Sequence, residues 1–313
     1  MNEYIRICRI DHWLKNIFIV FGHAVAFVLG PSVDLNVGNI LVCALSLVPA
    51  CFIASANYIL NEILDAPFDR THPTKRLRGV AAGKVNITIL WGIKVILIIL
   101  GFVIAFQFFD IGYIIALALL LLSGVVYNVQ PLRLKDRAYL DVIAESFNNP
   151  IRLWLGWYAL VPLHGYEADY RVPMTIVLAW WSFGALLMTG KRYAEFRFID
   201  DPEVSGRYRK SFRTYNNQKL IIAMITYANL FCFCTGIAMA THPEFENLIL
   251  VFPMIVIAII AYFHYAMSDV GARLEPERLM RHPWIIASTI ITALLALWLL
   301  SLDYSLVRAL HIL

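Results

Sequence analysis

The chain has 313 residues, of which 60% are hydrophobic and only 15% charged, and its mean hydropathy is +0.68. Because soluble domains carry about 25% charged residues, this composition excludes an ordinary soluble domain and indicates an integral membrane protein. The net charge of +4 does not indicate a nucleic-acid partner, since the basic residues follow the segments between apolar runs and do not line one groove.

Apolar runs close to the roughly 20 residues that cross a bilayer recur along the whole chain. They predict nine transmembrane helices, at residues 16–32, 40–62, 86–107, 112–128, 140–161, 173–190, 219–240, 248–268 and 284–302. Most of the 26 Lys and Arg residues lie in alternate connecting segments, so the positive-inside rule places the N-terminus in the cytoplasm and the C-terminus outside. The first fifteen residues lack a cleavage-site pattern, and we expect the first span to be retained.

The end of the second predicted span carries polar residues at every fourth position, namely Asn57, Asn61, Asp65 and Asp69. On a helix of about 3.6 residues per turn, such positions share one face. Pro67 disfavours helix at the residue before it, so we expect Asp69 in a turn just beyond the helix. Neighbouring carboxylates repel unless a cation lies among them, and their oxygens suit Mg²⁺ shared with substrate phosphates. The alternative is a polar helix end facing water, although polar residues deeper in an apolar run usually have a function.

The segment that follows, residues 70–83, is rich in cations and glycine and has no apolar stripe. Arginine can bind two phosphate oxygens at once. We therefore expect Lys75, Arg76 and Arg78 to neutralise a metal-bound diphosphate.

The stretch from Asn61 to Asp69 resembles the NDxxDxxxD motif of the UbiA superfamily of intramembrane prenyltransferases, with Glu62 in place of the usual first Asp. Residues 127–135 are similar to the superfamily's loop after the fourth helix. The resemblance covers almost the whole chain and implies one UbiA-like transmembrane domain over residues 1–313, all-α, with nine helices around a central cavity open to the cytoplasm. It also implies that Asn61, Asp65 and Asp69 form the catalytic core and, supported by Glu62, hold Mg²⁺.

The superfamily's second acidic motif, DxxxD at the end of the sixth helix, is replaced here by Lys191 and Arg192, with Glu195 following. Cations at a second phosphate site fit a donor with an additional phosphate better than a plain prenyl diphosphate. The alternative is an ordinary basic helix end at the cytoplasmic interface.

Three segments together, residues 72–83, 190–195 and 207–215, resemble the decaprenyl-phosphate phosphoribosyltransferase branch of the superfamily. That branch transfers 5-phosphoribose from phosphoribosyl diphosphate to a polyprenyl phosphate. The resemblance implies a 5-phosphate site and further substrate contacts among Lys191, Arg192, Tyr193, Glu195, Arg209 and Lys210. For Glu195, simple pairing with Lys191 at i, i+4 is the alternative. Lys15, at the start of the first span, is expected to bind a donor or an acceptor phosphate.

Two charged residues of the fifth predicted span, Glu145 and Arg152, lie two turns apart on one helical face. They form either a structural ion pair inside the bundle or part of the acceptor site.

The sequence thus favours a Mg²⁺-dependent phosphoribosyltransferase of the cytoplasmic membrane, with phosphoribosyl diphosphate and a polyprenyl phosphate as substrates. The acceptor phosphate is already ionised near neutral pH, so no general base is expected. A prenyltransferase acting on an aromatic or isoprenoid acceptor is the alternative, although it needs a second metal site that is poorly supplied here. A transporter is disfavoured because the polar motifs cluster at one membrane face. Small residues in several spans permit a homo-oligomer without specifying one.

Overall fold

The computed structural model describes residues 3–31, 33–70, 75–163, 171–199, 205–206, 208–268, 283–302 and 304–310. All regular elements in these ranges are helices, which confirms the all-α prediction. The chain forms two compact units, Met1–Val172 and Pro173–Leu313. The expectation that they form one domain concerns their association and stays a prediction.

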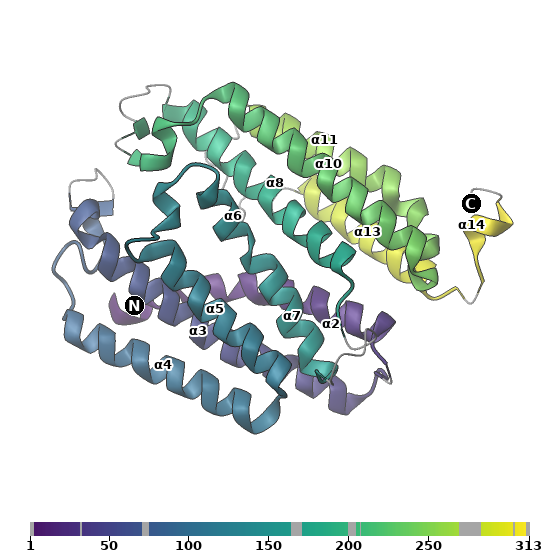
Figure 1. Cartoon of the computed structure of the whole chain (residues 1–313), viewed down its shortest axis with the longest axis horizontal. Helices are drawn as coiled ribbons and strands as arrows, with labels where there is room; N and C mark the ends of the chain where they lie inside the picture. Colours follow the sequence, from purple (N-terminus) through teal and green to yellow (C-terminus); the bar gives the residue numbers. More distant parts are fainter. Residues whose placement is uncertain are drawn as a thin grey trace. The chain divides into compact units, whose positions relative to one another are not determined.

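The first unit contains α1 (Glu3–Ile7), η1 (Ile10–Ile17), α2 (Phe18–Leu29), α3 (Val37–Asp69), η2 (Lys75–Leu77), α4 (Ile87–Phe108), α5 (Ile111–Asn128), η3 (Leu134–Asp136), α6 (Leu140–Ser146) and α7 (Asn148–Leu160) (Figure 1). The second contains α8 (Met174–Ile199), η5 (Lys210–Arg213), α10 (Asn217–Thr241), η6 (Pro243–Val251), α11 (Phe252–Met267), α13 (Pro283–Leu300) and α14 (Leu306–Ala309).

Within the described residues, seven helical segments are long and apolar enough to cross a membrane: Glu3–Leu29, Val37–Asp69, Ile87–Phe108, Ile111–Asn128, Met174–Ile199, Asn217–Thr241 and Pro243–Met267. The predicted fifth span is instead divided into α6 and α7 at Phe147. Pro150 explains the division, because a proline ring clashes with the carbonyl four residues earlier, here that of Ser146, the last residue of α6. The predicted ninth span corresponds to α13 (Pro283–Leu300), within which Ile290–Leu300 is a shorter apolar helical segment.

Asparagine marks the start of three long helices. The side chains of Asn36, Asn86 and Asn216 accept hydrogen bonds of 2.8 Å from the backbone N–H groups of Asn39, Thr88 and Lys219. These bonds satisfy amide donors that the first helical turn leaves without a partner. The caps therefore fix where α3, α4 and α10 begin.

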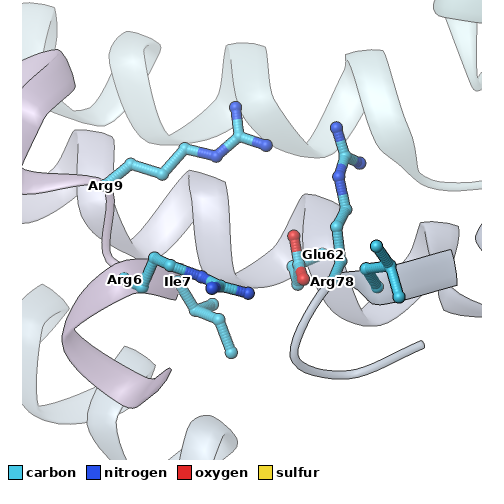
Figure 2. Close-up of a pocket in the computed structure, with 6 residues that line it drawn as sticks. Arg6, Ile7, Arg9, Glu62 and Arg78 are labelled. Carbon is cyan, nitrogen blue, oxygen red and sulfur yellow. The ribbon is translucent and has the colours of Figure 1, made fainter. Parts of the chain in front are cut away.

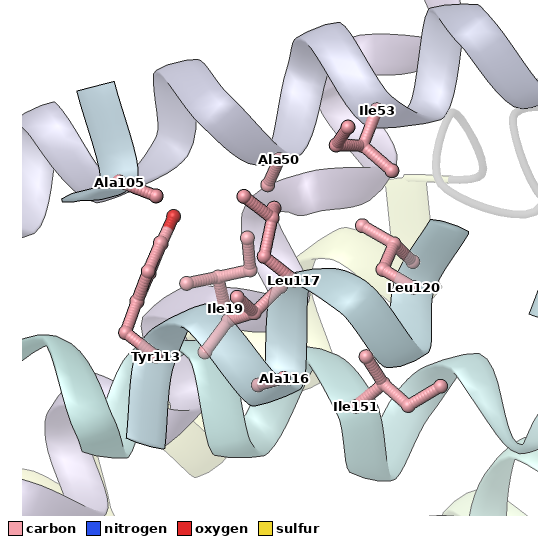
Figure 3. Packing of buried hydrophobic residues seen from close by; sticks show 10 residues of the cluster. Ile19, Ala50, Ile53, Ala105, Tyr113, Ala116, Leu117, Leu120 and Ile151 are labelled. Carbon is pink, nitrogen blue, oxygen red and sulfur yellow. The ribbon is translucent and has the colours of Figure 1, made fainter. Parts of the chain in front are cut away.

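The core of the first unit is an apolar cluster contributed by α2, α3, α4, α5 and α7 (Figure 3). Its buried members are Ile19, Ala50, Ile53, Ala105, Tyr113, Ala116, Leu117, Leu120, Ile151 and Leu155. The Tyr113 hydroxyl donates to the Ser46 carbonyl at 2.5 Å, so the one polar atom in this cluster is satisfied. This packing holds α3 and α5 in a fixed relation.

The crossing of α2 and α7 depends on two glycines. A Cβ on Gly156 would lie 2.1 Å from the Ile19 carbonyl oxygen, and one on Gly22 would lie 2.2 Å from that of Leu153. Such close approach of backbones is how membrane helices gain packing energy without a hydrophobic driving force. Glycine at both positions is therefore required for this contact.

In the second unit, α8 packs along α10. The Tyr262 hydroxyl on α11 donates to the Leu187 carbonyl on α8 at 2.8 Å, which ties α11 to the same helix. Trp181 of α8 and Tyr227 of α10 meet edge to face, with ring centroids 5.8 Å apart. The end of α8 that carries Lys191 and Arg192 thus lies on a packed scaffold.

Candidate active site

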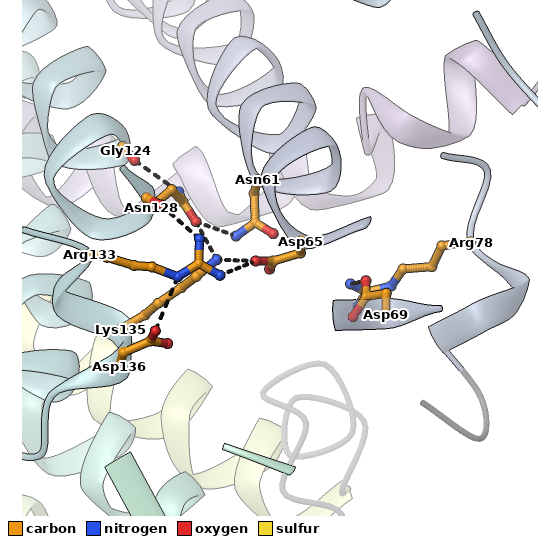
Figure 4. Close-up of polar contacts among 9 residues, drawn as sticks. All are labelled: Asn61, Asp65, Asp69, Arg78, Gly124, Asn128, Arg133, Lys135 and Asp136. Carbon is orange, nitrogen blue, oxygen red and sulfur yellow. Dashed lines mark hydrogen bonds and ion pairs between the residues drawn. The ribbon is translucent and has the colours of Figure 1, made fainter. Parts of the chain in front are cut away.

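The central feature of the first unit is Asp65, near the end of α3, which is held by two cations from the segment between α5 and α6 (Figure 4). Asp65 Oδ1 accepts from Lys135 Nζ at 2.5 Å and from Arg133 Nη2 at 2.9 Å. The Lys135 and Arg133 side chains are each 10% exposed and that of Asp65 is 19% exposed. A nearly buried carboxylate is therefore bridged by two nearly buried cations.

The loop that carries these cations is folded back on itself. Arg133 has a φ of 32°, in the left-handed region, and starts η3. Its guanidinium also donates to the Asn128 carbonyl at 3.0 Å and to Asp136 Oδ2 at 3.2 Å. The ring of Phe68 lies 4.9 Å from the guanidinium carbon. These contacts fix the direction in which Arg133 reaches α3, although the left-handed backbone costs free energy.

A chain of amide groups fixes the orientation of Asn61. Asn128 Nδ2 donates to the Gly124 carbonyl at 2.8 Å, so its Oδ1 faces α3, where it accepts from Lys135 Nζ at 2.8 Å and from Asn61 Nδ2 at 2.9 Å. Because the nitrogen of Asn61 is committed as a donor, its carbonyl oxygen is the end that remains to accept. The network thus presents a hard oxygen ligand beside Asp65.

One turn deeper, α3 and α5 approach closely at Asn57 and Gly124. Asn57 Nδ2 donates to the Leu120 carbonyl at 2.8 Å, and a Cβ on Gly124 would lie 2.2 Å from the Asn57 side chain. Asn57 therefore links the two helices. This contact supports the site from the next turn of α3.

The last turn of α3 carries Asp69, whose Oδ2 accepts from Arg78 Nη1 at 2.7 Å. The expectation that Asp69 lies beyond the helix is wrong: α3 continues through Pro67 to Asp69, and the Arg70 N–H donates to the Ala66 carbonyl at 3.2 Å. A proline removes one helical donor, and the bond from Arg70 to Ala66 shows that the helix nonetheless continues past Pro67. Asp65 and Asp69 are therefore held on one rigid helical face.

Glu62 faces a different neighbourhood from Asp65. Its side chain is buried beside a cavity of about 310 Å³ that is also lined by Arg6, Ile7, Arg9, Leu77 and Arg78 (Figure 2). Being one residue from Asn61, it projects about 100° away around the helix. The metal-supporting role expected of Glu62 stays a prediction.

The donor set fits a hard divalent cation of the Mg²⁺ type. In the described part of the chain, the ion pairs of Asp65 and Asp69 each use a single carboxylate oxygen. The described residues contain no group of three or more Asp, Glu, His or Cys side chains arranged to enclose a metal. Mg²⁺ is typically bound by one or two carboxylates together with substrate phosphates and water, which is the set available here.

Burial lowers the pKa of Lys135, although the Asp65 carboxylate acts in the opposite direction. The ammonium group is therefore held in a nearly dry position where its charge costs free energy unless an anion faces it. Such a cation is well suited to bind an anionic substrate, because little water has to be displaced from it.

The N-terminal segment lies along α3 beside this face. His12 Nδ1 lies 3.2 Å from the Tyr58 hydroxyl, Trp13 Nε1 donates to Ser55 Oγ at 2.9 Å, and Asn16 Nδ2 contacts Cys51 Sγ at 3.2 Å. Lys15 is partly exposed in η1. The structure therefore places Lys15 on the segment that borders α3, and its phosphate-binding role stays a prediction.

Glu145 and Arg152 have separate partners within the described residues. Arg152 Nε donates to Asn16 Oδ1 at 3.1 Å and Arg152 Nη1 to the Asn148 carbonyl at 3.4 Å, whereas Glu145 Oε2 accepts from the Tyr127 hydroxyl at 3.1 Å. These contacts lie on the two sides of the break between α6 and α7 at Phe147, and the choice between a structural ion pair and an acceptor-site role stays a prediction.

In the second unit, Arg192 and Tyr193 are buried near the end of α8. Arg192 Nη1 lies 3.4 Å from Glu195 Oε2, so Glu195 pairs with Arg192 at i, i+3. The alternative of a Lys191–Glu195 pair is thus wrong for this structure, since both spacings are neighbours on a helix and the side-chain rotamer selects one. Lys191 is partly exposed.

Two other cations expected at a second phosphate site flank η5. Arg209 precedes it, with its guanidinium carbon 6.0 Å from the centre of the Phe212 ring, and Lys210, its first residue, is exposed. Both residues belong to the second unit, Pro173–Leu313, which also contains Lys191 and Arg192.

Some expected residues lie outside the described part of the chain. They are the Lys75 side chain, His72, Asp200, Asp201 and Arg207. Arg76, in η2, is exposed.

The structure adds Asn128, Arg133 and Lys135 to the candidate site. The sequence contained one signal for them, the similarity of residues 127–135 to the superfamily's loop after the fourth helix. Their contact with Asp65 nonetheless spans about seventy residues of chain, and a single sequence does not reveal such a pair.

The comparisons with known proteins agree with this arrangement. The family model described as "UbiA prenyltransferase family" matches residues 17–288. The decaprenyl-phosphate phosphoribosyltransferase of Mycolicibacterium smegmatis is 26% identical over 239 residues, which cover 76% of this chain and 70% of the relative. The protein of the same name from Mycobacterium tuberculosis is 27% identical over 281 residues, covering 87% and 85%.

Among solved structures, a UbiA homolog from Archaeoglobus fulgidus bound to DMAPP and Mg²⁺ superposes with a TM-score of 0.69 at 16% identity, covering 95% of this chain and 98% of that one. At this identity the likeness shows the fold alone. The family model, by contrast, covers well over half of the chain. The chain therefore belongs to the UbiA prenyltransferase family, a family of membrane-embedded transferases.

Proposed function

We propose that this protein transfers 5-phosphoribose from phosphoribosyl diphosphate to a polyprenyl phosphate and releases diphosphate. The acidic face of α3, where Asp65 and Asp69 are each paired with buried or half-buried cations, carries the part of the proposal that concerns a metal-bound diphosphate, and Lys191 and Arg192 at the position of the second acidic motif carry the choice of donor. Such a face provides oxygen ligands for a metal and cations for a diphosphate within one rigid element. The names of the relatives support phosphoribosyl diphosphate as the donor.

The residues that would hold Mg²⁺ are Asp65 and Asp69, with the carbonyl oxygen of Asn61. When bound, Mg²⁺ would neutralise diphosphate oxygens and so improve the leaving group. Neighbouring UbiA structures that contain Mg²⁺ with DMAPP or GPP support the use of a divalent ion in this fold.

Arg133, Lys135 and Arg78 would bind the diphosphate. In the described structure they neutralise Asp65 and Asp69, so they already point at the place where the metal ligands lie. Charge-assisted hydrogen bonds from such preorganised cations stabilise the negative charge that develops as the bond to the anomeric carbon breaks. The burial of Lys135 strengthens this effect, because the local dielectric constant is low.

The acceptor would attack the anomeric carbon with an oxygen of its phosphate. The second pKa of a phosphate monoester is about 6, so this nucleophile is ionised at neutral pH without a general base. The chain's own contribution is to position the two substrates and to exclude water from the reacting carbon.

The 5-phosphate of the donor would be bound by the cations of the second unit. Lys191 and Lys210 are the more accessible of these cations. Arg192 is paired with Glu195, and Arg209 lies near the Phe212 ring; both would help to orient the 5-phosphate. Tyr193 would add a hydroxyl contact. The replacement of the family's second acidic motif by cations supports this assignment.

We further propose that the protein spans the cytoplasmic membrane nine times, with a cytoplasmic N-terminus and the active site on the cytoplasmic side. The asymmetric distribution of Lys and Arg among the connecting segments supports this orientation.

Prenyl transfer from a prenyl diphosphate to an aromatic or isoprenoid acceptor is the second candidate. The solved UbiA homologs bound to DMAPP or GPP favour it, although they share no more than 17% identity with this chain. The two candidates use the same acidic face and differ in the donor.

Two labelled-donor assays on purified protein with Mg²⁺ test the proposal. One supplies phosphoribosyl diphosphate and a polyprenyl phosphate; the other supplies a prenyl diphosphate and an aromatic acid. We expect label in the lipid fraction in the first reaction alone, and none from either reaction with Asp65→Asn. Label in the product of the second reaction alone would exclude the phosphoribosyltransferase.

A further inference from the structure

A second cluster of cations surrounds Glu62, one turn before Asp65 on α3. Arg6 from α1, Arg9 at the start of η1 and Arg78 after η2 line the cavity with Glu62, and Ile7 and Leu77 complete its wall (Figure 2). These residues come from three segments that are separate in sequence. The cavity of about 310 Å³ is many times the roughly 15 Å³ that one water needs, so it has room for a ligand group.

The charges of the cavity depend on the metal ligand Asp69. Arg6 Nη2 pairs with Glu3 Oε2 at 2.9 Å, Arg78 Nη1 pairs with Asp69 Oδ2 at 2.7 Å, and Arg9 and Arg78 lie close enough to Glu62 to interact with it. Three cations and three carboxylates thus balance. If Asp69 coordinates a metal ion in place of its pairing with Arg78, the charge of Arg78 is no longer neutralised. The cavity then has a net positive charge.

Glu62 has a clear physical role in such a site. Guanidinium groups that converge on one cavity repel each other, and a buried carboxylate among them reduces that repulsion. The ring of Tyr58 lies 5.2 Å from the Arg9 guanidinium carbon and further restrains this side chain. The arginines are therefore held in place before an anion arrives.

The segments around the cavity expose apolar side chains. Leu77, on its wall, is 64% exposed, and the adjoining α1 and η1 expose further large apolar side chains, namely Ile5, Ile10, Leu14 and Ile17. A short amphipathic segment with arginine on it is typical of an element that lies in the lipid headgroup region. An anion that enters here is accordingly expected to carry a hydrocarbon chain.

We propose that the cavity lined by Arg6, Arg9, Glu62 and Arg78 binds a phosphate monoester, and that this group is the headgroup of the polyprenyl phosphate acceptor. The inference rests on the proposed function, because it assigns that reaction's acceptor. Arg78 contacts both the cavity and Asp69, so the acceptor phosphate is brought next to the metal ligands from the lipid side. Donor and acceptor would then share Arg78, with Arg133 and Lys135 on the donor side and Arg6 and Arg9 on the acceptor side.

Direct binding tests the proposal without turnover. A polyprenyl phosphate and the corresponding polyprenol are titrated into purified protein in nanodiscs, with and without Mg²⁺ and without any donor. We expect Arg9→Gln to weaken binding of the phosphate at least tenfold and to leave polyprenol binding unchanged. Mg²⁺ should strengthen phosphate binding to the wild-type protein.

The control variants separate binding from folding. Arg137→Gln removes an exposed arginine whose recorded side-chain contact is the Pro131 carbonyl, and it should bind as the wild type does. Arg9 has a φ of 48°, so Arg9→Lys and Arg9→Gln share the same backbone strain. Arg9→Lys should retain most of the affinity, and all variants should unfold at wild-type temperatures.

Two outcomes overturn the inference. Equal affinity of Arg9→Gln and Arg137→Gln for the lipid phosphate would exclude an anion site in the cavity. A raised KM for phosphoribosyl diphosphate in Arg9→Gln with unchanged lipid binding would assign the cavity to a donor phosphate. If the wild type binds polyprenyl phosphate in an Arg9-dependent way but forms no phosphoribosyl lipid, the proposed function fails and the binding site stands.

Discussion

Asp65 and Lys135 form a salt bridge, yet we expect their substitutions to affect stability differently. Asp65→Asn leaves Arg133 and Lys135 facing each other with no carboxylate between them. Removing one partner of a buried ion pair typically costs about 3 kcal/mol, and we expect that loss in the free energy of unfolding. Arg133 retains Asp136 at 3.2 Å, which keeps the cost from being larger.

Lys135→Met removes a cation whose burial already lowers its pKa, while Asp65 keeps its pairing with Arg133 at 2.9 Å. The free energy of unfolding should therefore change by less than about 1 kcal/mol, because the desolvation cost of the ammonium group is also removed. In the double variant, Asp65→Asn with Lys135→Met, the repulsion between two cations that lack a carboxylate is removed. About 2 kcal/mol of the free energy lost in Asp65→Asn should therefore be recovered.

SDS titration of the purified protein in mixed micelles, followed by circular dichroism, measures the four free energies of this cycle. Activity assays on the same samples should show no turnover for Asp65→Asn or for the double variant. A Lys135→Met variant that loses as much stability as Asp65→Asn, or a double variant in which the losses add, would refute the reasoning.

Three other predictions follow from the contacts described above. Gly156→Ala should lower the free energy of unfolding by about 1–3 kcal/mol, because its Cβ meets the Ile19 backbone. Gly92→Ala, where a Cβ meets open space, is the matched control and should be neutral or slightly stabilising. Equal changes in the free energy of unfolding for the two variants would contradict the close approach of α2 and α7. Added Mg²⁺ should raise the thermal unfolding midpoint of the wild type but not of Asp65→Asn, and EDTA should stop turnover reversibly; a shift of equal size in both proteins would place the metal elsewhere. Lys191→Ala should raise the KM for phosphoribosyl diphosphate about tenfold and leave that for the lipid unchanged, and an unaltered donor KM would exclude a 5-phosphate contact.

The sequence was most informative where periodicity decides the structure. The repeat of polar residues from Asn57 to Asp65 correctly predicted one helical face, since a regular helix leaves little freedom in where such side chains lie. Apolar runs located most of the membrane-crossing helices for the same reason.

Proline and side-chain pairing were harder to predict. Pro67 is accommodated inside α3, whereas Pro150 coincides with the division between α6 and α7, because tertiary packing decides whether a lost hydrogen bond is tolerated. Glu195 has possible partners at two helical spacings, and only the folded chain selects Arg192.

The cations that hold Asp65 were the largest omission of the sequence interpretation. Arg133 and Lys135 lie in an irregular loop whose conformation includes a left-handed arginine, and no periodic pattern predicts where such a loop points. Likewise, Arg6 and Arg9 are distant from Glu62 along the chain, and only the folded structure brings the three together around one cavity.

The central claim is that the donor carries phosphoribose and that the membrane lipid is the acceptor. A competition reaction tests it most directly: purified protein in nanodiscs with Mg²⁺, phosphoribosyl diphosphate, a prenyl diphosphate, a polyprenyl phosphate and an aromatic acid together, with products identified by mass spectrometry. We expect a polyprenyl phosphate that carries one phosphoribose and an aromatic acid recovered unchanged. A prenylated aromatic acid with the polyprenyl phosphate unchanged would contradict the account.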